Sequence, residues 1–125
     1  MRKFSFSHAK GMQSFDFIST FKSLEELSVG YTTKLVKLPQ VANPKKIISL
    51  TLINTPKFND MEGILQYENL EKFVMNEHTV IPFEEITKLE KLKKLKKVYL
   101  NFKKESDHRL FEELVHRNGW INNNL

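Results

Sequence analysis

The chain has 125 residues, of which 40% are hydrophobic; this is enough for one folded domain and excludes a chain that is disordered throughout. It contains no cysteine, which excludes disulfides, cysteine-type zinc sites and thiol catalysis. The sequence has no run of roughly 20 apolar residues that would span a membrane, and its start lacks the apolar stretch of a secretory signal. We therefore expect a cytoplasmic protein with no membrane association. The high content of lysine, asparagine and phenylalanine is typical of an A+T-rich genome, and we expect a bacterial source.

The net charge of +5 is concentrated in one segment. Residues 88–104 hold eight lysines and one glutamate, so the rest of the chain is slightly acidic. Two interpretations stay open. The lysines form the solvated face of ordinary elements, with Glu84 and Glu90 four residues before Lys88 and Lys94, or they form a patch that binds nucleic acid or an acidic partner.

The pattern apolar-x-x-apolar-x-apolar occurs five times along the chain. It starts at Met1, Leu24, Ile47, Leu70 and Leu95, so the first four starts are evenly spaced and the last step is slightly longer. We call each stretch from one start to the next a unit and number its positions from that first apolar residue. Apolar residues at positions four and six alternate as in a strand. A fixed period of this length predicts a solenoid of parallel strands.

The segments that return the chain from one strand to the next differ from unit to unit. Residues 14–21 predict a short helix with Ser14 as its N-cap, whereas the prolines within 36–46 predict an irregular return. Residues 60–68 predict a helical turn that buries Ile64 and Leu65. Pro82 opens a longer helix through Lys93, with Phe83, Ile86 and Leu89 facing inward.

The end of the chain departs from the repeat. Residues 107–117 have helical apolar spacing, with Ser106 as the expected N-cap and Gly119 as the expected stop. We expect this helix, followed by a packed Trp120, to cover the open end of the core, as terminal segments of solenoids do. The domain then consists of units at about 1–23, 24–46, 47–69, 70–94 and 95–106, and a cap at 107–120.

The repeated motifs resemble those of the leucine-rich repeat family, in its short-repeat class with a period of about 23 residues. The residues that carry the resemblance are Leu24-x-x-Leu27-x-Val29, Ile47-x-x-Leu50-x-Leu52, Leu70-x-x-Phe73-x-Met75 and Leu95-x-x-Val98-x-Leu100. The resemblance implies an α/β solenoid with five parallel strands on a concave face, short helices and irregular segments on a convex face, and a C-terminal helical cap. It also implies protein recognition.

Position nine departs from the family. The family's usual asparagine or cysteine is replaced by Ala9, Thr32, Thr55, His78 and Lys103 in the five units. We expect the hydroxyls of Thr32 and Thr55 to donate hydrogen bonds to neighbouring carbonyls, and the ladder of such bonds to be partial at best.

Side chains at positions two, three, five, seven and eight are expected to point off the concave face into solvent. Apolar or aromatic residues occupy several of these positions, where folding does not require them, and charged residues flank them. This combination is typical of a protein interface, although β-propensity alone also places such residues on strands. The expected partner-binding residues are Tyr31, Ile48, Ile53, Val74, Lys96, Tyr99 and Phe102.

Other functions find less support in the sequence. No glycine-rich phosphate loop or hydrolase motif is present, and we expect no catalysis and no cofactor. His108, Glu112 and His116 share one helical face, but two turns separate the histidines, so we expect no metal site. The expected first strand starts within a few residues of Met1 and has no cap, which favours an alternative role as an assembly module that pairs two chains along this edge.

Overall fold

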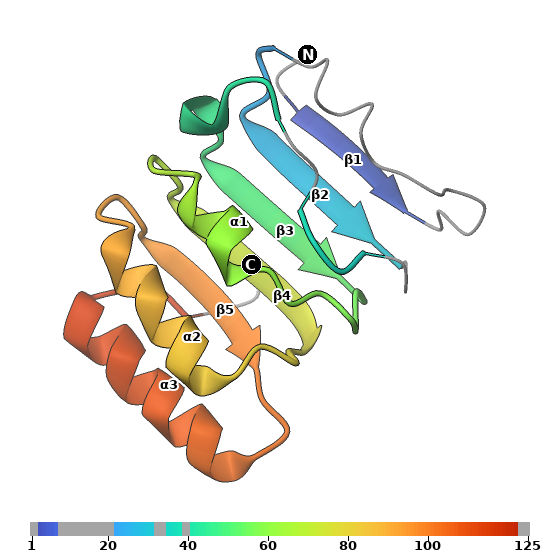
Figure 1. Cartoon of the computed structure of the whole chain (residues 1–125). Coiled ribbons are helices and arrows are strands. Elements are labelled where there is room, and N and C mark those ends of the chain that lie inside the picture. The colour runs from blue at the N-terminus through green and yellow to red at the C-terminus, as the bar shows by residue number, and fades with distance from the viewer. Residues whose placement is uncertain (1–2, 8–21, 32–34, 39–40, 123–125) are drawn as a thin grey trace.

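A computed structural model describes residues 3–7, 22–31, 35–38 and 41–122. Within them the protein is an α/β domain with one five-stranded parallel sheet, whose strands follow in chain order. Helices α1 and α2 lie over one face of the sheet, and α3 runs beside α2 at the β5 end (Figure 1). The helix expected over 14–21 lies outside the described residues. The elements are β1 (Lys3–Ser7), β2 (Glu26–Gly30), β3 (Ser49–Ile53), α1 (Met61–Leu65), β4 (Lys72–His78), α2 (Phe83–Ile86), β5 (Lys97–Asn101) and α3 (Glu105–Asn118).

The strands pair in the register of the sequence repeat. Third-position residues stand side by side across the sheet, in the order Lys3, Glu26, Ser49, Lys72 and Lys97. The predicted set of five parallel strands is therefore confirmed. A shift of register in the β4–β5 pair lies between Val74 and His78, so β4 continues past the point where the regular pairing ends.

The apolar positions of the units form the core. First, fourth and sixth positions from the second unit onward are all buried, and each stacks on its equivalents in neighbouring strands. Burying one such aliphatic side chain stabilises a fold by about 1.5–3 kcal/mol, so this repeated burial is the main source of stability. These residues are Leu24, Leu27, Val29, Ile47, Leu50, Leu52, Leu70, Phe73, Met75, Leu95, Val98 and Leu100.

The first residue after β2 and the first residue after β3 share a left-handed backbone conformation. Tyr31 and Asn54, which both occupy position eight, have left-handed φ angles of 55° and 53°. The backbone N–H of Tyr31 donates to the carbonyl of Ile53 over 2.7 Å and joins the two turns. A left-handed conformation is costly for a tyrosine, so the neighbouring turn helps to hold it.

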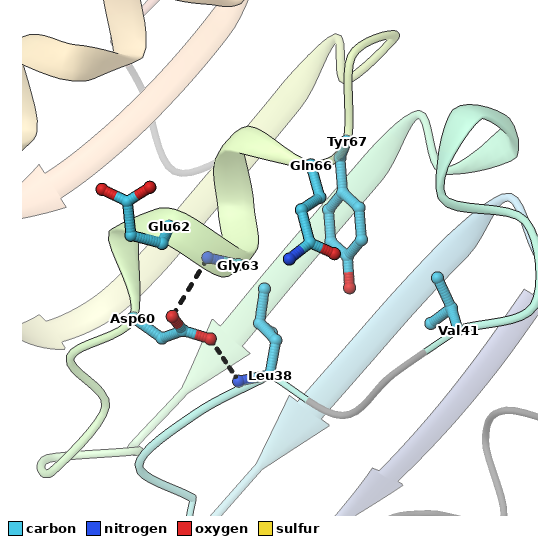
Figure 2. A pocket seen from close by; sticks show the side chains of 7 residues that line it. All are labelled: Leu38, Val41, Asp60, Glu62, Gly63, Gln66 and Tyr67. Carbon is cyan, nitrogen blue, oxygen red and sulfur yellow. Dashed lines mark hydrogen bonds between the residues drawn. The ribbon is translucent and has the colours of Figure 1, made fainter.

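Asp60 anchors the return segment that contains α1 (Figure 2). It is the N-cap of α1, and its Oδ1 accepts a hydrogen bond from the Gly63 N–H over 3.0 Å. Its Oδ2 accepts from the Leu38 N–H over 2.9 Å, which ties this return to the preceding irregular one. A side chain at position 63 would overlap the Asp60 carboxylate, which explains a glycine inside this short helix.

The returns largely follow the predictions. As expected, the described part of 36–46 is irregular apart from a 3-10 turn at Pro44–Lys46, and α1 buries Ile64. Leu65, also expected to be buried, is only half-buried. The helix expected from Pro82 is present, but it tightens from α2 into a 3-10 segment over Thr87–Lys91.

Helix α3 caps the β5 end of the sheet. It buries Phe111 and Leu114 against the core and ends, as predicted, at Gly119 in a left-handed conformation with φ 68°. The expected N-cap is wrong: Ser106 lies inside the first turn, because the helix begins at Glu105 after an extended Lys104. Trp120 is 8% exposed and packs into the core.

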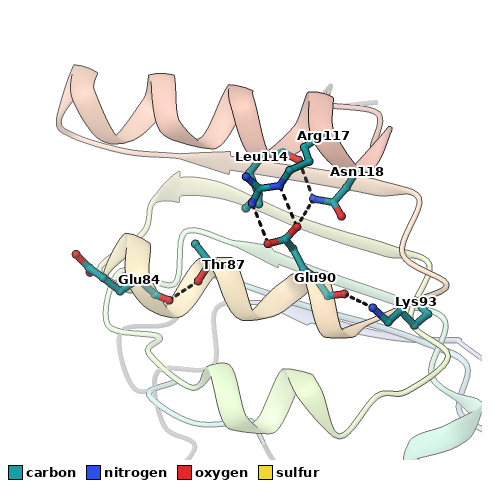
Figure 3. A network of polar contacts seen from close by, with 7 residues as sticks. All are labelled: Glu84, Thr87, Glu90, Lys93, Leu114, Arg117 and Asn118. Atoms are coloured by element: carbon teal, nitrogen blue, oxygen red, sulfur yellow. Dashed lines mark hydrogen bonds and ion pairs between the residues drawn. The ribbon is translucent and has the colours of Figure 1, made fainter.

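A polar network ties α3 to the helical return beneath it (Figure 3). The Glu90 carboxylate accepts hydrogen bonds from Arg117 Nε and a second guanidinium nitrogen over 3.2 and 2.9 Å, and from the Asn118 side-chain amide over 3.0 Å. The hydrogen bonds from Arg117, followed by that from Asn118, lower the pKa of Glu90 below its ordinary value of 4.5.

We expect Glu90→Gln to lower the melting temperature at pH 7, because the neutral amide loses its charge-assisted contacts with Arg117. A lowered folded-state pKa contributes stability that is present above pH 4.5 and disappears as the pH falls through the folded value. The gap between wild type and variant in thermal melts should therefore close in acid. Glu84→Gln removes the same charge away from Arg117 and is the control. An equal loss in both variants would contradict the prediction.

Thr55 does not form the hydrogen bond expected at position nine. It is 1% exposed, and its hydroxyl has no hydrogen-bond partner among the described residues. The expected donation to a neighbouring carbonyl is therefore wrong for Thr55, and Thr32 lies outside the described residues. A buried hydroxyl without a partner costs about 1–3 kcal/mol.

Thr55→Val should therefore raise the free energy of unfolding, by about 1 kcal/mol, because valine keeps the shape and removes the unpaired hydroxyl. Urea denaturation measures the change. Thr55→Ser, which keeps the hydroxyl and removes the methyl group, is the matched control and should destabilise. If valine destabilises as much as serine does, the hydroxyl has a partner in solution.

Candidate functional site: the open face of the sheet

The seven residues expected to bind a partner do not form one surface. Ile48 and Lys96 directly precede β3 and β5, at the end of the sheet where strands begin. Tyr31 and Ile53 lie at the opposite end, where β2 and β3 finish. Of these four, Tyr31 is 47% exposed, and Lys96 is exposed and pairs with Glu71 over 3.4 Å. The two pairs are separated by the length of a strand.

Phe102 is not on the sheet face. Its ring packs 5.5 Å from the ring of Phe111 in α3 and 6.2 Å from the ring of Phe83 in α2, measured between centroids. The reason is that β5 ends at Asn101, so the next residue already turns toward the cap. Phe102 is half-buried and belongs to the packing between the helices, away from the other expected partner-binding residues.

Val74 lies on the face of the sheet that no described helix covers, which we call the open face, but its side chain is not accessible to solvent. It is 3% exposed, whereas the sequence predicts an exposed side chain. Val74 sits on an inner strand between Thr51 and Tyr99 in the register, with Lys72 before it on the same face. A short side chain beside longer neighbours is shielded, even on a sheet face that no described helix covers.

Two rows of side chains cross the open face. Because paired residues of parallel strands lie about 4.8 Å apart, equal unit positions become neighbours. In the row formed by position three, charged residues lie on both sides of a central serine. In the row formed by position five, the residues on β1 to β3 are serine or threonine, and those on β4 and β5 are Val74 and Tyr99. The rows are Lys3, Glu26, Ser49, Lys72, Lys97 and Ser5, Ser28, Thr51, Val74, Tyr99.

The small side chains leave a shallow hollow over β1 to β4. It has a volume of about 280 Å³. Serine and threonine present hydroxyls that both donate and accept, so this surface suits hydrogen bonds to a bound backbone or polar side chain. Residues of both rows that line it are Lys3, Ser5, Glu26, Ser28, Ser49, Thr51 and Lys72.

The charges of the third-position row are distributed unequally. Lys3 is paired with Glu26 over 3.3 Å. Lys72 and Lys97 stand next to each other, and within the described residues neither forms a salt bridge. Partial burial lowers the pKa of Lys97, and the adjacent positive charge of Lys72 lowers it further.

We expect Lys72→Gln to raise the pKa of Lys97, because the variant removes the repelling charge. The rise should be incomplete, since burial is the larger cause and remains. Titration of the Lys97 side chain by NMR measures it. Lys94→Gln, at an exposed lysine of the same basic segment, is the control and should leave Lys97 unchanged. A Lys97 pKa that does not move in Lys72→Gln would show that the two ammonium groups point apart.

A second cavity lies on the helix face between α1 and the irregular return (Figure 2). It measures about 310 Å³ and is lined in part by Asp60, Gln66 and Tyr67. The buried Tyr67 hydroxyl has no hydrogen-bond partner among the described residues, and burial, followed by the charge of Asp60, raises its pKa. Both Asp60 oxygens already accept backbone N–H groups, so we assign this carboxylate a structural role.

The lysines of 88–104 are distributed over several elements. Lys88 lies in the helical return and pairs with Glu85 and Glu62 over 2.8 and 3.4 Å, whereas Lys97 is on the open face. Lys103 and Lys104 lead into α3. The segment runs from the helical return through β5 to the start of α3, so its positive charges lie on different elements.

The open face carries residues that sequence reasoning did not select. Lys72, Lys97 and the hydroxyl residues occupy solvent-facing positions three and five, but only apolar and aromatic residues and Lys96 are among the expected partner-binding residues. The usable signal was the recurrence of Ser5, Ser28 and Thr51 at position five, and of lysine at position three. Their juxtaposition becomes visible only in the register of the sheet.

His108 and Glu112, noted as possible metal ligands, form an ordinary side-chain pair over 3.1 Å in α3. Among the described residues, no group of three histidine or acidic side chains is placed to hold a metal ion.

Comparison with known proteins gives no relative. Neither a family model, nor a curated protein, nor a solved structure matches this chain. None of the helices in the described residues is long and apolar enough to cross a membrane.

Proposed function

We propose that the chain is a short leucine-rich-repeat solenoid of a bacterial cytoplasm, and that its open sheet face binds a segment of a partner protein without catalysis. The observation that carries the proposal is the hollow over β1 to β4, on the face opposite to the described helices. The side chains that line it from positions three and five are not part of the apolar core. Packing of the core therefore does not dictate which residues stand there, and they can serve to recognise a partner.

The repeat supports the solenoid part of the proposal. The paired residues are evenly spaced along the chain in the first three steps and slightly further apart in the last, which matches the spacing of the sequence motifs. The returns before β4 and β5 carry α1 and α2 over the same face of the sheet, as in a solenoid built of equivalent units.

The composition of the hollow favours binding over catalysis. Among the described residues that line it there is no histidine, and its one acid, Glu26, is paired with Lys3. Hydroxyls with no base beside them are poor nucleophiles but good hydrogen-bond partners. Tyr99, half-buried at the β5 side, adds an aromatic contact of the kind that is enriched at protein interfaces.

Nucleic acid fits the structure less well than protein does. Binding to a phosphate backbone needs several cations on one surface. The lysines of 88–104 are distributed over several elements, and Glu85, Glu62 and Glu71 neutralise Lys88 and Lys96.

A pull-down from a lysate of the source organism, with identification by mass spectrometry, tests the binding proposal. Thr51→Arg should fill the hollow and lose the captured partner, since an arginine cannot fit where a threonine lines a shallow site. Gln66→Arg adds the same side chain on the helix face and should keep the partner. Circular dichroism verifies that both variants fold. Equal capture by wild type and Thr51→Arg would contradict the proposal.

The β1 edge favours a second candidate function, the assembly of two chains. Ile121 adds two main-chain hydrogen bonds to the outer edge of β5, whereas no described strand pairs with the outer edge of β1. An unpaired strand edge is a template for strand addition. Light scattering after size-exclusion chromatography tests this, and a monomer at high concentration removes it.

A further inference from the structure

Two lysines of the open face, one on β4 and one on β5, are neighbours and form no salt bridge among the described residues. In the register, Lys72 and Lys97 are direct partners, so the strands hold their stems about 4.8 Å apart. Like charges placed directly opposite each other on a sheet are destabilising. The lowered pKa of Lys97 has the same origin in part, since Lys72 contributes to it after burial.

Two other lysines are neutralised by acids of the domain. Lys3, in the same row, pairs with Glu26, and Lys96, the residue before Lys97, pairs with Glu71. Lys72 and Lys97 have no such acid among the described residues. An acid supplied by a bound partner would relieve their repulsion.

The surroundings of the two lysines suit a carboxylate on an extended segment. Ser49 is the next residue of the row on one side and offers a hydroxyl donor, and Tyr99 follows Lys97 on the same face. Lys72 also lines the hollow over β1 to β4, so a segment bound there reaches the lysines without leaving the surface.

We propose that Lys72 and Lys97 together bind an aspartate or glutamate side chain of the partner's segment, with the rest of that segment lying in the hollow over β1 to β4. This deepens the proposed function and rests on it. The two ammonium groups hold one carboxylate between them, and Ser49 donates to it from the β3 side.

The mixed signs of charge along the row favour a protein as the occupant. A nucleic acid strand that crosses the sheet would carry a phosphate past Glu26 as well as past the lysines. A protein segment matches the row because it can place an acid at Lys72 and Lys97 and a neutral or basic residue at Glu26. Charge complementarity therefore favours an acidic peptide over a polyanion.

Fluorescence anisotropy with two labelled peptides tests this directly. One peptide carries a run of glutamates between glycine–serine flanks, and the other has glutamine in place of each glutamate. Wild type should bind the glutamate peptide more tightly, and the double variant Lys72→Gln/Lys97→Gln should weaken that binding by at least about tenfold. Lys91→Gln/Lys94→Gln removes the same charge at exposed lysines off the open face and should bind like wild type.

Several results would overturn the inference. One is equal affinity of wild type for the two peptides, or no binding of either. Another is an equal loss of affinity in both double variants, which indicates unspecific attraction. A third is tighter, Lys72- and Lys97-dependent binding of single-stranded oligothymidylate, which would make the occupant a nucleic acid. A pull-down partner lost by Thr51→Arg but kept by Lys72→Gln/Lys97→Gln would overturn this inference and leave the proposed function standing.

Discussion

Parallel pairing in constant register is the constraint on which the rest of this domain depends. Side chains alternate between the two faces of a strand, so a slip of one residue would turn Leu27, Leu50 and Phe73 from the core to solvent. The apolar rows prevent that slip, because each buried residue stacks on its equivalents in neighbouring strands. The same register then determines which polar residues meet on the other face.

The open face shows the consequence of this coupling. One unit position brings together Lys3 and Glu26 at one end of the sheet, where the charges cancel, and Lys72 and Lys97 at the other, where they repel. The folding energy of the core holds the second pair together in spite of its repulsion. An acidic side chain of a bound partner would offset this repulsion.

The helix face is held by contacts that the repeat does not supply. Asp60 joins two successive returns through backbone N–H groups, and Glu90 joins the last return to α3. Phe102 fills the space between α2 and the cap. These links differ from unit to unit, which lets the returns vary while the strands stay equivalent.

The five strands, their order and register, and the core rows follow from the amino-acid sequence alone, because periodic burial of apolar residues is a local property that repeats. The end of α3 at Gly119 follows from it too, since few other residues adopt the left-handed conformation there. The burial of Val74, the packing of Phe102 and, among the described residues, the unpaired hydroxyl of Thr55 do not follow from the sequence alone, because they depend on neighbours from other units. The juxtaposition of Lys72 and Lys97 is likewise tertiary: they lie a whole unit apart in the chain, and only strand pairing makes them one site.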